Sequence, residues 1–468
     1  MKRILSEFVN RSAYRSPYHK YRIFLLPITF WMLLSGIVHV HAQPERVFVI
    51  NEGAFGQGNA SMTVFEPQTG YAANNVFFDE NNRLLGDVGN DGVLINGKLY
   101  IVINNSHKIE VVDPESYQSL GTISIDAESH GGSPRKMAEV DAGKAYVTNL
   151  YGNNVSIIDL DAGEEIGHVE VGPGPEGIVV ADGYAFVALS GLGQGNEVAV
   201  IDIQTDELIK NLDVGDNPIH IARGPEGKVW SVGTGNFGFD QNYEYDPDLE
   251  TFGEVVIIDP ESQEIVDRFD TGGHPGKLVF PNEELGLLQL NGLRAVDIES
   301  RKLQETPFLE RNLHSFDIAD GEHDQFQVFI TLAPDFSSSG RIIKYDDQAS
   351  PVDSFQAGIG PGSIAFWYGK TTGSRTQPEI VENISIDQNY PNPFNSSTRI
   401  RFYLPESAGA RLEVFDMLGR SVAVLVNEQL RRGDHEIRFD ASGLSSGVYT
   451  YRLTADGASR SRRMMHVK

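Results

Sequence analysis

A short apolar strand that ends in an acidic residue recurs along most of the chain. It reads VSIIDL at 155–160, IEVVDP at 109–114 and VVIIDP at 255–260. The seven copies place their acidic residues at Glu66, Asp113, Asp159, Asp202, Asp259, Asp297 and Asp346, with spacings of 38 to 57 residues. A period near 45 residues indicates a fold built from repeated units, each holding several short strands.

Each repeat contains three further strands around the one that ends in the acidic residue. A strand rich in β-branched and aromatic residues precedes it, such as KAYVTN at 144–149. A Gly/Pro turn and another apolar strand come earlier, as in 172–180, and a fourth strand follows, as in 165–171. Four strands per repeat predict an all-β fold, a seven-bladed β-propeller with four-stranded blades.

The two ends of the repeat region explain how such a ring would close. Residues 46–51 already have the pattern of a second strand, and the missing inner strand matches 360–367. We therefore expect one blade to combine strands from both ends, because closure removes exposed sheet edges. The predicted propeller spans 43–368.

A different pattern begins after the repeats. Residues 369–385 are polar and lack periodicity, which predicts a linker. Alternating apolar and polar residues at 398–402, 411–416, 422–426, 435–439 and 447–453 then predict a small antiparallel β-sandwich over 386–468.

The N-terminus has the pattern of a signal peptide over residues 1–42. A basic stretch precedes the apolar run at 23–38, and Val-His-Ala at 40–42 offers a cleavage site. The run is shorter than the roughly 20 residues of a membrane span, so we expect no transmembrane segment after cleavage. The absence of cysteine excludes disulfides, thiolate metal sites and a lipid anchor on cysteine.

Charge narrows the range of partners. The formal net charge is -27, and residues 43–385 hold 20 basic and 55 acidic side chains. Such a surface repels phosphate backbones, which argues against nucleic-acid binding.

Two groups of motifs resemble known families. The motif YVTN at 146–149, with its repeats over 46–368, resembles the YVTN-type, YncE-like seven-bladed propellers. NYPNPFN at 389–395, VFDMLGR at 414–420 and LSSGVY at 444–449 closely resemble the C-terminal sorting domain of type IX secretion substrates. The second resemblance implies export by Sec and then by the type IX machinery, to the outer cell surface or the medium.

The loops after the second strands and before the inner strands are expected to share one face of the ring. Mouths of closed β structures are favoured ligand sites, and imidazole is a common ligand near neutral pH. The candidate ligand contacts on this face are Asn51, Phe55, Asn104, His107, His130, Arg135, Asn149, Tyr151, Glu176, His220, Phe237, His274 and His314. No His-x-His or His-Glu-x-x-His spacing supports a metal centre, and each histidine could instead bond its own turn.

The longest spacing contains an insertion at 233–253. Oxygen-bearing side chains alternate at Asp240, Asn242, Glu244 and Asp246, an arrangement that can wrap Ca²⁺. The glycine and the final glutamate of a calcium loop are missing, which weakens this hypothesis. The aromatic residues of the insertion suit packing over a flat ligand.

The segment 49–61, followed by YVTN repeats, is similar to BtuG-type surface propellers that capture cobalamin. This resemblance implies a non-catalytic protein that binds a small molecule, with a corrinoid as the most specific expectation. BtuG-type proteins carry a lipid anchor, whereas this chain has no cysteine for one and has a predicted sorting domain instead. A surface adhesion or scaffold protein and a metal-dependent propeller hydrolase or lyase remain alternatives, although no nucleophile elbow or P-loop is present.

Overall fold

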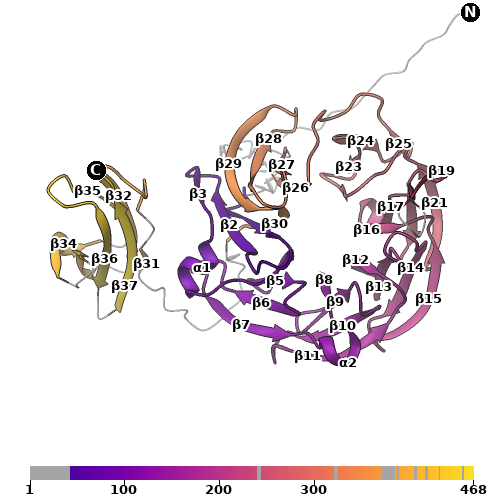
Figure 1. The fold of residues 1–468 in the computed structure, drawn as a ribbon, viewed down its shortest axis with the longest axis horizontal. Helices are drawn as coiled ribbons and strands as arrows, with labels where there is room; N and C mark the ends of the chain where they lie inside the picture. The colour runs from indigo at the N-terminus through magenta and orange to yellow at the C-terminus, as the bar shows by residue number, and fades with distance from the viewer. Residues whose placement is uncertain are drawn as a thin grey trace, which may run out of the picture. The chain divides into compact units, whose positions relative to one another are not determined.

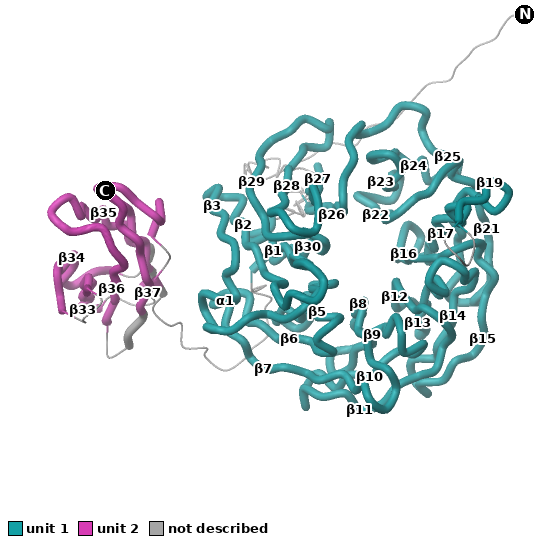
Figure 2. The backbone as a smooth tube through the Cα atoms, in the orientation of Figure 1, with its two compact units in different colours: residues 1–371 teal, residues 372–468 magenta. Residues whose placement is uncertain are grey.

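The computed structural model describes residues 43–239, 244–320, 325–369, 385–386, 389–404, 408–416, 420–431, 433–455 and 458–468. They form two compact units, 1–371 and 372–468, coloured separately in Figure 2. The predicted signal peptide, and the predicted linker from 370 to 384, lie outside the described residues. No helix in the described part of the chain is long and apolar enough to cross a membrane.

The described residues of the first unit form seven four-stranded antiparallel sheets. From inner to outer strand, sheet 1 contains β30 (Pro361–Trp367), β1 (Arg46–Asn51), β2 (Ser61–Glu66) and β3 (Tyr71–Ala73), and sheet 2 contains β4 (Gly89–Ile95), β5 (Lys98–Ile103), β6 (Lys108–Val112) and β7 (Ser119–Ser124). In the same order, sheet 3 contains β8 (Pro134–Glu139), β9 (Lys144–Asn149), β10 (Asn154–Asp159) and β11 (Glu164–Glu170), and sheet 4 contains β12 (Pro175–Ala181), β13 (Tyr184–Leu189), β14 (Glu197–Asp202) and β15 (Glu207–Asp213). Sheet 5 is β16 (Pro218–Arg223), β17 (Val229–Gly233), β20 (Glu254–Asp259) and β21 (Glu264–Asp270); sheet 6 is β22 (Leu278–Val279), β23 (Leu285–Gln289), β24 (Leu293–Asp297) and β25 (Lys302–Leu303); sheet 7 is β26 (Ser315–Asp320), β27 (Phe326–Leu332), β28 (Ser339–Tyr345) and β29 (Pro351–Ile359).

The sheets follow one another around a common centre, with the first strand of each sheet innermost (Figure 1). The ring closes in sheet 1, where β30 pairs with β1 in an antiparallel register from Arg46↔Trp367 to Asn51↔Pro361. The prediction that strands from the two ends of the repeat region share one sheet is therefore confirmed.

Apolar clusters between neighbouring sheets hold the ring together. Phe48 and Ile50 of sheet 1 pack with Leu99 and Ile101 of sheet 2, and similar clusters join the later pairs. The last cluster returns from sheet 7 to sheet 1, where the ring of Phe65 stacks on that of Phe355 with centroids 4.3 Å apart. Full burial of a side chain of this size contributes about 1.5–3 kcal/mol, so these seams stabilise a closed β-propeller.

The acidic residue of each repeat serves the turn that follows it. In Asp113, Asp159, Asp202 and Asp259, one carboxylate oxygen accepts hydrogen bonds from the backbone N–H groups two and three residues later. This geometry is typical of Asp in turns. These four acidic positions are therefore structural.

Four features of the ring were not predicted as elements. The helix α1 (Val76–Asn81) follows β3, and the one-turn helix α2 (Ala127–His130) begins after its N-cap Asp126. A short 3₁₀ turn, η1 (Pro225–Gly227), follows β16. The insertion in sheet 5 forms a hairpin of β18 (Phe237–Phe239) and β19 (Tyr245–Glu250).

The second unit is a β-sandwich, as expected. One sheet contains β31 (Ser385–Ile386), β32 (Ser397–Leu404) and β35 (Gly433–Asp440). The other contains β34 (Ser421–Leu430), β33 (Ala408–Phe415), β36 (Gly447–Ala455) and β37 (Ala458–His466). One apolar cluster that includes Phe402, Leu412 and Tyr451 joins the two sheets.

Candidate ligand-binding face

One end of the ring carries two sets of loops, which together we name the loop face. One set connects the second and third strands of each sheet, and the other leads into the first strands. The two sets touch: the backbone N–H of Tyr151, after β9, donates to Ser133 Oγ, before β8, at 2.7 Å. Glu52, after β1, pairs in the same way with His314, before β26, with 2.9 Å between Oε1 and Nε2. The expectation that these loops share one face is confirmed at these contacts.

Exposed aromatic side chains gather on this face. Among the described residues of the ring, eight Phe and Tyr side chains are exposed, and seven of them lie on connections between second and third strands. These seven are Phe55, Tyr151, Phe237, Phe239, Tyr245, Phe252 and Phe336; the eighth, Phe78, lies on α1. Apolar surface concentrated in one region of a soluble protein marks an interaction site.

The densest group is the aromatic cluster, which we define as Phe237, Phe252 and His274 with Tyr245 and Glu250. The ring of His274 stacks on Phe237 at 4.1 Å between centroids and meets the edge of Phe252 at 5.8 Å. Two polar contacts fix the imidazole: Nδ1 lies 2.8 Å from Thr234 O, and Nε2 lies 3.2 Å from Glu250 Oε1.

The carboxylate of Glu250 completes the aromatic cluster. It accepts a further hydrogen bond from the Tyr245 hydroxyl at 3.0 Å. The hydrogen bonds from His274 and Tyr245 lower the pKa of Glu250, so this group is ionised at neutral pH. The cluster thus offers flat ring faces beside the Glu250 carboxylate.

Local sequence places the hairpin that carries these residues. Residues Phe237 and Phe239 of β18 pair with Glu250 and Tyr245 of β19. Gly235 adopts φ +73° at the base of the hairpin, and a Cβ there would lie 2.1 Å from Thr251 O. Only glycine fits this position, since it adopts positive φ without steric cost and leaves room for the neighbouring backbone.

The calcium prediction concerns the tip of the same hairpin. Asp240 and Asn242 lie outside the described residues, and Glu244 and Asp246 are described. The Asp246 carboxylate accepts a hydrogen bond from the backbone N–H of Asp248 at 3.0 Å. Within the described ranges, no group of three or more His, Asp or Glu side chains is placed to hold a metal ion.

Two predicted contact residues lie inside the protein. Asn51 and Asn149 end β1 and β9, and both are fully buried. Asn149 Nδ2 donates to Asn154 Oδ1 and Ser156 Oγ, while its Oδ1 accepts from the Ser133 backbone. Asn149 was expected to contact a ligand on the loop face, but it is the last residue of β9 and its amide bonds the buried groups at the strand end. We leave both residues out of the proposed site, since a buried side chain cannot reach a surface ligand.

Sheet 2 shows the same use of polar side chains. Asn104 is buried and donates from Nδ2 to the carbonyl oxygens of Ser133 and Pro134 at 3.1 and 3.0 Å. His107 Nδ1 lies 2.5 Å from Gly132 O. Both side chains fasten the second-to-third-strand loop of sheet 2 to the segment that leads into sheet 3.

His130 is also separated from the aromatic cluster. Its Nε2 lies 3.0 Å from Glu165 Oε1, and its ring stacks on His168 with centroids 4.5 Å apart. Glu165 and His168 belong to β11, the outer strand of sheet 3. His130 therefore ties α2 to the outer part of its own sheet.

Arg135 and Glu176 join two neighbouring first strands. Arg135 Nε lies 2.7 Å from Glu176 Oε2. Burial alone would lower the pKa of Arg135, but the charges of Glu176 and Glu52 raise it. Glu52, which contacts His314, thus also acts on Arg135 through its charge.

Further polar side chains lie on the first strands or directly before them, beside the predicted His220, and Lys136, Asp91, Ser363 and Asp317 among them were not predicted. Lys136 pairs with Asp91 at 3.2 Å, Ser363 Oγ donates to Asp91 at 3.1 Å, and Lys277 pairs with Asp317 at 2.6 Å. His220 Nε2 lies 2.8 Å from Leu278 O. Burial and the charge of Lys277 lower the pKa of His220 to about 3, so its ring is neutral at physiological pH.

Comparison with known proteins agrees with this two-part organisation. Residues 45–245 match a family described as a domain of unknown function, DUF5074. Residues 388–468 match the secretion system C-terminal sorting domain. A search of curated proteins gave no match.

Many solved structures are similar to the chain, and two of them cover about 70% of it. A quinonprotein alcohol dehydrogenase-like protein from Bacteroides thetaiotaomicron is 13% identical, with 70% of this chain and 79% of that chain covered and a TM-score of 0.50. A protein from Lactobacillus plantarum is 12% identical, with 69% and 99% covered and a TM-score of 0.50. Similarity at this level shows the fold alone. The chain is therefore a β-propeller with a C-terminal sorting domain that directs it, by type IX secretion, to the cell surface or the extracellular space.

Proposed function

We propose that the chain is a seven-bladed, non-catalytic propeller that binds a small planar ligand on its loop face outside the cell. The observation that carries this proposal is the concentration of exposed aromatic rings on one set of loops, centred on the stack of Phe237 on His274. The count of blades rests on the seven four-stranded sheets and the clusters that join them in sequence.

The chemistry of the aromatic cluster supports a ligand with a broad flat surface. The side chain of Phe252 is 61% exposed and that of Phe237 is 47% exposed. Exposed rings of this kind bury a large apolar area when a planar molecule packs on them. Glu250 adds a carboxylate at the rim, which suits ligands that carry hydrogen-bond donors or positive charge on their edge.

A corrinoid is the ligand class that we infer. The macrocycle is broad and has amide donors around its edge, and the sequence similarity of 49–61 to BtuG-type propellers points to the same class. Phe55 of sheet 1 and Tyr151 of sheet 3 are also exposed on the loop face and would extend the contact beyond the hairpin.

A calorimetric titration of cyanocobalamin into the purified chain tests this proposal. Saturable one-site binding at micromolar protein is expected. Adenosine and haem serve as planar comparison ligands. Absence of heat with cyanocobalamin would overturn the corrinoid assignment, and absence of heat with all three would overturn planar-ligand binding.

A further inference from the structure

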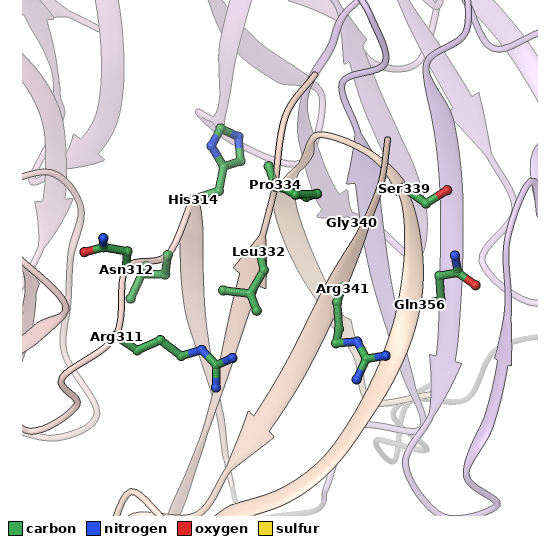
Figure 3. Close-up of a pocket in the computed structure, with 11 residues that line it drawn as sticks. Arg311, Asn312, His314, Leu332, Pro334, Ser339, Gly340, Arg341 and Gln356 are labelled. Atoms are coloured by element: carbon green, nitrogen blue, oxygen red, sulfur yellow. The ribbon is translucent and has the colours of Figure 1, made fainter. Parts of the chain in front are cut away.

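A pocket of about 790 Å³ lies beside sheet 7, between its strands and the segment that leads into it from sheet 6. Its polar lining includes Arg311, His314, Arg341 and Gln356, and its apolar lining includes Leu313 and Leu332 (Figure 3). Pockets that hold small molecules have volumes of roughly 300–1,000 Å³, so this one has the size of a ligand site.

The charge of the pocket is opposite to that of the protein around it. Residues 43–385 contain 55 acidic and 20 basic side chains, yet among the described residues two arginines and no Asp or Glu line this pocket. Figure 3 shows Arg311 and Arg341 on either side of Leu332, with both side chains extending toward the same side.

Neither guanidinium is neutralised by a carboxylate in the described part of the chain. Arg311 donates from Nη1 to the Tyr345 hydroxyl at 3.3 Å, a neutral partner that leaves its charge uncompensated. The guanidinium of Arg341 forms no hydrogen bond or ion pair with another described residue, and the cross-strand neighbours of Arg341 are Leu332 and Gln356. Two arginines without a carboxylate partner, beside an apolar surface, are suited to bind an anion that also has an apolar portion.

We propose that this pocket binds a small organic anion, a carboxylate or phosphate ester with an apolar portion, independently of the aromatic cluster. The guanidinium groups of Arg311 and Arg341 bind the anionic group. Leu313 and Leu332 contact the apolar portion, and the Gln356 amide lies beside Arg341 as a further hydrogen-bonding group. The proposal does not depend on corrinoid binding.

Three probes separate the two parts of the recognition. Phenyl phosphate carries both an anion and an apolar ring, inorganic phosphate carries the anion alone, and benzylamine carries the ring with a positive charge. Titration of the full chain by calorimetry is expected to show the tightest binding for phenyl phosphate, weaker binding for inorganic phosphate and none for benzylamine.

Arg341→Gln is expected to weaken phenyl phosphate binding about tenfold, because a charge-assisted hydrogen bond is lost. Arg341 is exposed, so the variant should retain the wild-type midpoint of thermal unfolding. Arg223→Gln is the matched control. Arg223 is an exposed arginine of sheet 5, away from the pocket, and it pairs with Asp182 at 3.5 Å. This control variant is expected to bind phenyl phosphate within twofold of wild type.

Equal affinities for the Arg341→Gln and Arg223→Gln variants would overturn the proposal. So would the absence of saturable phenyl phosphate binding to wild type, or equally tight binding of benzylamine. Arg311→Gln provides a second variant with the same expected loss of affinity. Because Arg311 also contacts Tyr345, this variant could fail to fold. In that case the affinity of the Arg341→Gln variant alone tests the proposal.

Discussion

Phe237 stacks on His274 with the two ring centroids 4.1 Å apart and their planes inclined by 21°. Phe237 belongs to the hairpin inserted in sheet 5, whereas His274 belongs to the segment that leads into sheet 6. The contact therefore fixes an inserted element to the ring and keeps one face of an aromatic pair at the surface. A ligand that packs there meets a surface that is already ordered, which reduces the entropy lost on binding.

Replacement of both exposed phenylalanines should remove the ligand surface without unfolding the ring. We expect the double variant Phe237→Ala/Phe252→Ala to weaken cyanocobalamin binding by about tenfold or more, because each buried aromatic contact contributes about 0.5–1.5 kcal/mol beyond its area. Phe78→Ala is the matched control, since Phe78 is 45% exposed but lies on α1. Calorimetry measures the affinity and circular dichroism the thermal midpoint. If the double variant binds cyanocobalamin with wild-type affinity, the ligand does not bind at the aromatic cluster.

Asn149 and Tyr151 are expected to behave differently although they are close in sequence. Asn149→Ala removes an amide that satisfies three buried partners, and each buried group left without a partner costs about 1–3 kcal/mol. Tyr151→Ala should leave stability almost unchanged, because the side chain is 66% exposed. Chemical denaturation of the two single variants measures the difference. Equal stability would show that the hydrogen bonds of Asn149 are dispensable.

His220 should make the ring less stable in mild acid. Its pKa is lowered to about 3 in the native protein, mainly by burial, while histidine in an unfolded chain titrates near pH 6.5. Between these values the unfolded chain binds more protons than the native one, so stability falls as pH decreases from about 6.5 toward 3. His220→Gln cannot take up this proton and retains an amide donor for Leu278 O. Its thermal midpoint should therefore fall less than that of wild type between pH 7 and pH 4.5, and an identical fall would contradict the assignment.

The sorting domain should be required for export but not for folding of the ring. Among the described residues, the sorting domain has an apolar core cluster of its own, and the ring has its own clusters between sheets. Deletion of 386–468 is expected to leave a folded propeller in the periplasm of a host with type IX secretion. Fractionation and protease treatment of intact cells measure its location, with the full chain as the control. Surface display of the truncated chain would contradict the role of this domain.

Most of the fold could be predicted because it repeats. The alternation of apolar residues and the acidic turn positions located the strands, and the incomplete first repeat predicted the pairing of β1 with β30. β37 was missed because its sequence, ASRSRRMMH, is dominated by polar residues. β37 is held in the sheet by pairing with β36 along its whole length. Pairing between two strands cannot be predicted from the periodicity of one of them.

The site was harder to predict for a physical reason. Asn, His and Asp on loops are equally suited to contact a ligand or to satisfy backbone groups, and only the structure distinguishes the two roles. Asn51, Asn104 and Asn149 serve the backbone, whereas Phe237 and His274 form an exposed stack. Arg311 and Arg341 were missed because their charges meet only when the segment before β26 folds beside β28.

A crystal structure of the chain with cyanocobalamin, with anomalous diffraction recorded at the cobalt edge, tests the central claim most directly. The cobalt position is independent of how the surrounding density is interpreted. We predict one strong anomalous peak above the loop face, with the corrin ring packed on Phe237, Phe252 and His274. A peak on the opposite face of the ring or on the sorting domain, or crystals grown with the ligand that show no cobalt signal, would contradict the account.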